Sequence, residues 1–230
     1  MPFELGMKQG LLAAEFSTQQ INNHWMNLLD CQSGFPAQWS FWHRETEGEI
    51  DLLLSFSELI IGIEVKYLSG ISSEDVLEQD QQIDYEESVN QLSRYSRMLE
   101  RLSEGRDAYL LFLSPFEMMN DVRKRMEARQ IISPFVHLGY IYWEDIYQSL
   151  LKLDLKQFET GQQMIIEDLR ALLLKKGFVR FRGFDLKDSI PPITTAHYSY
   201  DNHTLKDKVF LNWPIQNIKG DQNYDYRITE

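Results

Sequence analysis

The stretch EIDLLLSFSELIIGIEVK, residues 49–66, is the most apolar run of the chain and decides the fold around it. Its Leu and Ile residues recur with a period of two, which is typical of β-strands. The pattern predicts one strand over residues 50–56 and a second over residues 59–68, with a tight turn at residues 57–58. Two strands joined by so short a turn form an antiparallel hairpin.

The charged residues of this hairpin are predicted to meet on one face of the sheet. A turn centred on residues 57–58 places Asp51 opposite Glu64 and Glu49 opposite Lys66. Directly opposed residues have Cβ atoms roughly 4.5–5.5 Å apart, so Asp51 and Glu64 could share one Mg2+. Removing an ionised group from water costs several kcal/mol unless the group is paired, binds a metal or takes part in chemistry. The stretch is therefore a candidate functional site, provided that the register does not slip by one residue.

Composition limits the class of protein. The chain has 230 residues, 43% of them hydrophobic, and its single cysteine, Cys31, excludes an internal disulfide and a zinc site with several cysteines. A lone cysteine suits a reducing compartment, and no signal peptide or membrane-spanning run is evident, so we expect a cytoplasmic protein that does not enter a membrane. The net charge of −12 argues against a broad surface that binds polyanions such as nucleic acid. This net charge includes the carboxylates that would bind a cation but leaves out the cation's own positive charge.

The remaining segments predict an α/β protein whose central sheet continues through helical crossovers. Apolar spacing predicts helices over residues 7–29, 89–105, 117–130 and 162–176, and another that begins at Trp143. It predicts strands over residues 37–43, 108–114 and 135–142. Residues 178–184 are expected to form a last strand or an extended segment. Residues 69–87 predict a mobile acidic loop, either functional or a plain connection. We expect one domain over residues 1–184, with a C-terminal helical extension, and an extended aromatic-rich arm over residues 185–230 that packs on the domain or on a partner.

Several helical residues carry specific expectations. Glu15 lies among apolar positions and either reaches the candidate site or is an exposed helix glutamate. Arg94, Arg97 and Arg101 follow i, i+3, i+7 spacing, so they form a stripe that either holds phosphates or pairs with acids. In the helix over residues 162–176, the side chains expected to face inward are Met164, Ile165, Leu169, Leu172 and Leu173.

The order of elements and the placement of the acids resemble the PD-(D/E)XK nuclease superfamily, which has a restriction-endonuclease-like fold with an αβββαβ core. The motif stands here as Ile50-Asp51 on one strand and Glu64-Val65-Lys66 on the next. Isoleucine replaces the family's frequent proline, a variation that leaves the metal ligand intact.

A second element supports the resemblance. Gln91 and Tyr95 are similar to the Gln-x-x-x-Tyr element of the RecB-like branches of the superfamily. Their i, i+4 spacing places both side chains on one face of the helix over residues 89–105. The resemblance covers roughly residues 7–115.

The resemblance implies a metal-dependent site. Asp51, Glu64 and the backbone carbonyl of Val65 would hold one or two Mg2+ ions through hard oxygen ligands, and Mn2+ would substitute for Mg2+. Lys66 would orient or deprotonate the attacking water and stabilise the transition state by its charge.

The same resemblance implies supporting roles for other side chains. Gln91 and Tyr95 would position the nucleic acid or order water around the metal. Arg94 and Arg97 would contact flanking phosphates, and Glu15 would complete the catalytic set.

These roles predict a Mg2+-dependent deoxyribonuclease acting in defence, repair or mobile-element biology, with DNA rather than RNA as the expected partner. Cleavage of both strands with one site per chain would call for a homodimer. The alternative is a catalytically silent module that keeps the nuclease fold and binds nucleic acid or a protein partner, which would suit the acidic balance and the aromatic arm.

Overall fold

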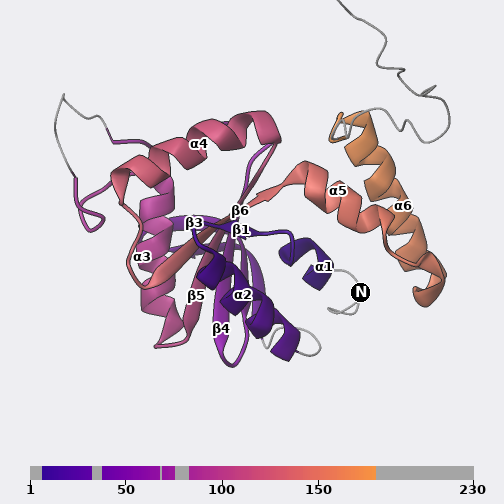
Figure 1. The fold of residues 1–230 in the computed structure, drawn as a ribbon, viewed down its shortest axis with the longest axis horizontal. Helices are drawn as coiled ribbons and strands as arrows, with labels where there is room; N and C mark the ends of the chain where they lie inside the picture. The colour runs from indigo at the N-terminus through magenta and orange to yellow at the C-terminus, as the bar shows by residue number, and fades with distance from the viewer. Residues whose placement is uncertain (1–6, 33–37, 68, 76–82, 180–230) are drawn as a thin grey trace, which may run out of the picture. The chain divides into compact units, whose positions relative to one another are not determined.

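The computed structural model describes residues 7–32, 38–67, 69–75 and 83–179. They form a six-stranded mixed sheet, in the order β1-β6-β5-β4-β3-β2, with helices on both faces (Figure 1). The prediction of an α/β protein with a central mixed sheet flanked by helices is confirmed. No helix in the described part of the chain is long and apolar enough to cross a bilayer.

The elements follow the predicted order from the strand over residues 38–45 onward. The strands are β1 (Glu15–Phe16), β2 (Gln38–Glu45), β3 (Gly48–Ser55), β4 (Leu59–Val65), β5 (Asp107–Ser114) and β6 (Val136–Tyr142). The helices are α1 (Met7–Leu11), α2 (Gln19–Cys31), α3 (Gln91–Ser103), α4 (Phe116–Arg129), α5 (Trp143–Leu151), the short 3-10 helix η2 (Leu155–Gln157) and α6 (Thr160–Lys175).

The hairpin of β3 and β4, in which β4 is one of the two central strands of the sheet, has the predicted register. Leu52 pairs with Ile63 and Ser55 with Ile60 in an antiparallel ladder. Its turn is closed by the backbone N–H of Phe56, which donates to the carbonyl of Leu59 at 2.8 Å. On its other side β4 pairs in parallel with β5, so the carboxyl ends of β4, β5 and β6 reach the same edge of the sheet.

Two apolar clusters cover the two faces of the sheet. One contains buried residues of α3 and α4, and the other contains Trp25 and Leu29 of α2. Helix α3 packs closely over β4 because Gly62 has no side chain: a Cβ there would lie 2.5 Å from Ile50 Cδ1 and 2.9 Å from Leu99 Cδ1. This close contact holds the third turn of α3 against β4, and the first turn of the helix reaches the end of β4, where Gln91 bonds to Glu64.

The prediction of one continuous helix over residues 7–29 is wrong. The chain forms α1, then the short strand β1, then α2, which begins after Thr18. The Thr18 side chain caps α2 by accepting from the N–H of Ile21 at 3.2 Å. Phe16 of β1 is buried against Trp25, with 5.4 Å between ring centroids. The apolar spacing suggested one helix because two helices and a strand all face the same core.

The C-terminal helices α5 and α6 pack against each other around a third cluster that includes Tyr147, Ile166 and Leu173. Met164, Ile165 and Leu172 are exposed, so the prediction that they face inward is wrong, whereas it holds for Leu173. Helix α6 carries apolar residues on more than one side, and its sequence cannot tell which side α5 covers. The strand expected over residues 178–184 lies largely outside the described residues, and the arm over residues 185–230 lies wholly outside them.

Candidate active site

The candidate site lies where the β3–β4 hairpin meets the start of α3. Asp51 comes from β3, Glu64 from β4, and Lys66 follows β4 directly. Gln91 and Tyr95 come from the first two turns of α3. The structure therefore brings together these five of the predicted site residues.

Glu64 is the central side chain of this cluster, and only 3% of its surface is exposed. Its Oε1 accepts from Lys66 Nζ at 2.7 Å and from Gln91 Nε2 at 2.8 Å, whereas its buried Oε2 accepts from no donor among the described residues. Burial raises the pKa of Glu64 to about 7 because it disfavours the charged carboxylate. Lys66 opposes this shift, and the nearby charge of Asp51 adds to it.

Asp51 is held at the point where the hairpin ladder stops. The last backbone pair on that side is Leu52 with Ile63, one pair short of the expected pairing of Asp51 with Glu64. Instead, Asp51 Oδ2 accepts from the backbone N–H of Val65 at 2.7 Å. The carboxylate thus takes the place of a backbone carbonyl in the ladder and lies beside Glu64.

Gln91 and Tyr95 lie on one face of α3, as their spacing predicted. Gln91 Nε2 donates to the Tyr95 hydroxyl at 3.0 Å as well as to Glu64, and Gln91 Oε1 accepts from the backbone N–H of Ser72 at 2.9 Å. The Tyr95 hydroxyl donates to the backbone carbonyl of Glu49. Burial raises the pKa of Tyr95, so its hydroxyl stays protonated and continues to donate at neutral pH.

Lys66 is fixed by contacts that sequence reasoning missed. Its backbone N–H donates to the carbonyl of Leu113 in β5 at 2.8 Å, and its carbonyl accepts from Trp143 Nε1 in α5 at 2.8 Å. The side chain is 11% exposed. A tryptophan directly before two acids at the start of a helix was visible in the sequence, but nothing local linked it to Lys66.

Two acids expected near the site are engaged elsewhere. Glu15 lies in β1, which β6 and β5 separate from β4, and it forms an ion pair with Arg123 at 3.1 Å. It is not on a helix, and the structure does not bring it to the cluster. Glu49 pairs with Arg44 at 2.9 Å rather than with Lys66.

The arginine stripe of α3 is occupied by groups of the protein itself. Arg94 donates to the Glu47 carbonyl and to Ser73 Oγ, and Arg97 donates to the carbonyls of Tyr85 and Ser88. Arg101 pairs with Glu45 and Glu47 at 3.0 and 2.9 Å. Pairing with acids, one of the two roles predicted for the stripe, is therefore seen for Arg101, whereas Arg94 and Arg97 bond to carbonyl and hydroxyl oxygens.

The donor set of the cluster fits a hard divalent cation. Asp51 and Glu64 lie close enough for a protonated Glu64 to hydrogen bond to Asp51, and no donor among the described residues reaches the buried Glu64 Oε2, which is unusual for a carboxylate oxygen in a protein interior. Within the described ranges no group of three or more His, Cys, Asp or Glu side chains could hold a metal, so the two carboxylates would need backbone, water or substrate oxygens as further ligands.

Comparison with protein families adds no assignment. No protein-family model matches the chain, and no curated protein matches it either. The functional conclusion therefore depends on the geometry of the cluster.

Proposed function

We propose that the protein is a Mg2+-dependent nuclease that hydrolyses phosphodiester bonds of DNA and has a restriction-endonuclease-like fold of the PD-(D/E)XK type. The order α2, β2, β3, β4, α3, β5 corresponds to the αβββαβ core of that fold. The observation that carries the proposal is the buried Glu64 carboxylate, which lies beside Asp51 and Lys66 and whose Oε2 receives no hydrogen bond from the part of the chain that the structure describes.

In the proposed site, Asp51, Glu64 and the carbonyl of Val65 would hold the cation. Bound Mg2+ supplies charge neutralisation and a water of lowered pKa next to the scissile phosphate. Asp51 is oriented for this role by the N–H of Val65, which holds Oδ2 in place. Mn2+, which also accepts oxygen ligands, would replace Mg2+.

Lys66 provides the positive charge of the proposed site. Its ammonium group lies 2.7 Å from Glu64 Oε1 and is largely shielded from solvent, so its charge acts over a short distance. From this place it would orient the attacking water and stabilise charge on the phosphate. Gln91 and Tyr95 hold Glu64 in position through the hydrogen-bonded chain that ends at the Glu49 carbonyl.

Cleavage assays test the proposal. With Mg2+ or Mn2+ and several DNA and RNA substrates, Asp51→Ala and Lys66→Ala should each lower the cleavage rate by about 100-fold or more. Asp51→Ala removes a proposed metal ligand, and Lys66→Ala removes the positive charge beside the phosphate. Glu127→Gln, which breaks an exposed ion pair with Arg123 on α4, is the matched control and should leave cleavage unchanged. Metal-dependent cleavage that survives both site substitutions would refute the mechanism.

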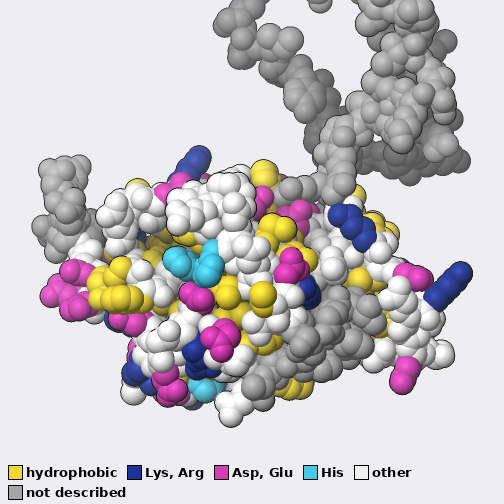
Figure 2. Space-filling model, turned by 60° about the horizontal axis from the view of Figure 1, so that its bottom comes forward, with side chains coloured by type: hydrophobic (Ala, Val, Ile, Leu, Met, Phe, Trp, Pro, Cys, Tyr) yellow, Lys and Arg dark blue, Asp and Glu magenta, His cyan; other side chains and the backbone are white. Residues whose placement is uncertain are grey.

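A nuclease-fold module that binds nucleic acid or a protein without cleaving is the second candidate. The protein-binding form of this candidate is favoured by the bonds that Arg97 and the terminal nitrogens of Arg94 already make within the protein, and by the net charge of −12, because all of these disfavour contact with phosphates. On the face shown in Figure 2, the coloured residues intersperse acidic and basic side chains and form no continuous basic band. Calorimetric titration with Mg2+ separates the two: a binding heat that disappears in Asp51→Asn supports the enzyme, and no such heat supports the module.

The proposed biological setting is a cytoplasmic enzyme of defence, repair or mobile-element biology. One site per chain can cut only one strand at a time, so cleavage of duplex DNA would involve a homodimer. Sedimentation of the protein with and without a duplex substrate measures that assembly.

A further inference from the structure

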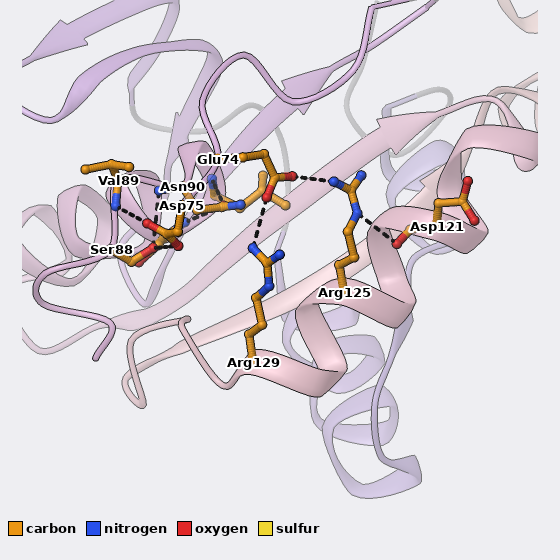
Figure 3. A network of polar contacts seen from close by, with 10 residues as sticks. Glu74, Asp75, Ser88, Val89, Asn90, Asp121, Arg125 and Arg129 are labelled. Carbon is orange, nitrogen blue, oxygen red and sulfur yellow. Dashed lines mark hydrogen bonds and ion pairs between the residues drawn. The ribbon is translucent and has the colours of Figure 1, made fainter. Parts of the chain in front are cut away.

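A short segment links the candidate site to α4. Residues 72–75, here called the strap, belong to the acidic segment over residues 69–87 that the sequence predicted to be a mobile loop. The strap has no regular secondary structure, yet every one of its four residues makes a hydrogen bond or ion pair with another element or with the residues before α3. Figure 3 shows the contacts of its second half.

The first half of the strap is bonded to Gln91. The backbone N–H of Ser72 donates to Gln91 Oε1 at 2.9 Å, and the backbone N–H of Gln91 donates to the carbonyl of Ser73 at 3.1 Å. An amide side chain has one accepting and one donating end. Because Ser72 occupies the accepting end, the donating end of Gln91 must face Glu64 and Tyr95.

Glu74 attaches the strap to α4. Its carboxylate bridges Arg125 at 2.6 Å and Arg129 at 3.0 Å, two arginines one turn apart on α4 (Figure 3). The Arg125 guanidinium also donates from Nε to the backbone carbonyl of Asp121, which limits its freedom to move. Two ion pairs that share one acid form a small network, which is stronger than an isolated surface pair.

Asp75 attaches the end of the strap to the residues before α3. It is 8% exposed and accepts from Ser88 Oγ and from the backbone N–H of Val89, both at 2.7 Å (Figure 3). Ser88 Oγ in turn accepts from the N–H of Asn90, whose side chain caps α3. A buried carboxylate with two short hydrogen bonds is a strong anchor.

We propose that Glu74 and Asp75 are positioning residues, which hold the strap against Gln91 and thereby keep the Gln91 amide turned toward Glu64. The site then depends on the chain from α4 through Glu74 to Ser72, Gln91 and Glu64, although Glu74 touches none of the site residues. This inference rests on the proposed function in one respect, the role of Glu64 in metal binding.

The spectroscopic test follows the Gln91 side chain directly in the 15N-labelled, metal-free full chain. Glu74→Gln keeps the shape of the side chain and removes both ion pairs, and Asp75→Ala removes the buried anchor. Glu127→Gln, which breaks an ion pair on the same helix α4, is the matched control. The readouts are the hydrogen-exchange rates of the Ser72 backbone amide and of the Gln91 side-chain amide.

We expect exchange of both groups to rise about fivefold in Glu74→Gln, about tenfold or more in Asp75→Ala, and not at all in Glu127→Gln. Faster exchange at Ser72 with no change at Gln91 overturns the positioning role, and so does no change at either group in Glu74→Gln. If Asp75→Ala does not fold, the result for Glu74→Gln decides alone, since the Glu74 side chain is partly exposed and the substitution keeps its shape.

Cleavage measured in parallel separates this inference from the proposed function. If the wild-type protein does not cleave nucleic acid but Gln91 responds to Glu74→Gln, the strap positions Gln91 and the proposed nuclease function fails. If the wild-type protein cleaves nucleic acid but Gln91 does not respond, the nuclease function stands and the strap inference is overturned.

Discussion

At Glu64, burial and ion pairing act in opposite directions. Burial raises the pKa of the carboxyl, and the ammonium group of Lys66, 2.7 Å away, lowers it. Burial is the larger of the two, so the pKa lies at about 7 rather than near 4.5. A carboxyl that is half protonated at neutral pH without metal is well placed to release its proton when a cation binds.

This raised pKa predicts a pH dependence of stability. Between pH 4.5 and about 7 the folded chain holds the Glu64 proton while the unfolded chain has lost it, so the free energy of unfolding falls as pH rises through this range. The shift corresponds to roughly 3 kcal/mol at most. Urea unfolding in EDTA should show this decline in the wild-type protein and a flatter profile in Glu64→Gln, which does not titrate. Parallel profiles for the two proteins would refute the raised pKa.

Helix α3 and strand β4 form the pair of elements that builds the site. Asn90 caps α3 by accepting from the N–H groups of Leu92 and Ser93, and the helix lies over Gly62. A capped end fixes where the helix begins, and the close contact fixes how near it comes to β4. Together they place Gln91 within hydrogen-bond distance of Glu64.

The contact at Gly62 predicts a cost for any side chain there. In Gly62→Ala the new Cβ would lie 2.5 Å from Ile50 Cδ1 and 2.9 Å from Leu99 Cδ1, so α3 or its neighbours must shift. Overpacking of this kind lowers the free energy of unfolding by about 1–3 kcal/mol. Gly161→Ala in α6, where no neighbouring atom of the described residues lies within 4 Å of the new Cβ, is the control and should be neutral or stabilising. Equal effects in urea unfolding would contradict the packing argument.

Across the whole molecule, acids outnumber bases, and the net charge is −12. Several arginines pair with acids at or near the surface, for example Arg101 with Glu45 and Glu47. Such pairs contribute little individually. A cation bound at Asp51 and Glu64 would instead act on charges that are shielded from water and already crowded.

Mg2+ should therefore stabilise the folded protein as a whole. A ligand that binds only the folded state at about 100 times its dissociation constant adds roughly 2.7 kcal/mol to the free energy of unfolding. Thermal unfolding at increasing MgCl2 should show a rising melting temperature for the wild-type protein and little change for Asp51→Asn. NaCl at matched ionic strength controls for screening of the net charge, and an equal rise in NaCl would contradict a specific site.

The sequence by itself determined the features that depend on neighbours along the chain. Period-two alternation and a two-residue turn predicted the hairpin, and the pairing of Leu52 with Ile63 confirms its register. The i, i+4 spacing of Gln91 and Tyr95 predicted a shared face, and their side chains are hydrogen bonded. These features follow from backbone periodicity, which any stretch of sequence carries within itself.

Only the tertiary structure decided which partners those residues meet. Glu15 is far from the cluster because β1 pairs with β6, and the N–H of Val65 holds Asp51 because the hairpin ladder stops early. Glu74 joins the strap to Arg125 of α4, a residue far from it in the sequence. Periodicity sets the face on which a side chain lies, but partners distant in the chain are chosen by how the layers pack. The hairpin of residues 49–66 was therefore predictable from its amino-acid sequence, whereas the partners of its charged side chains were not.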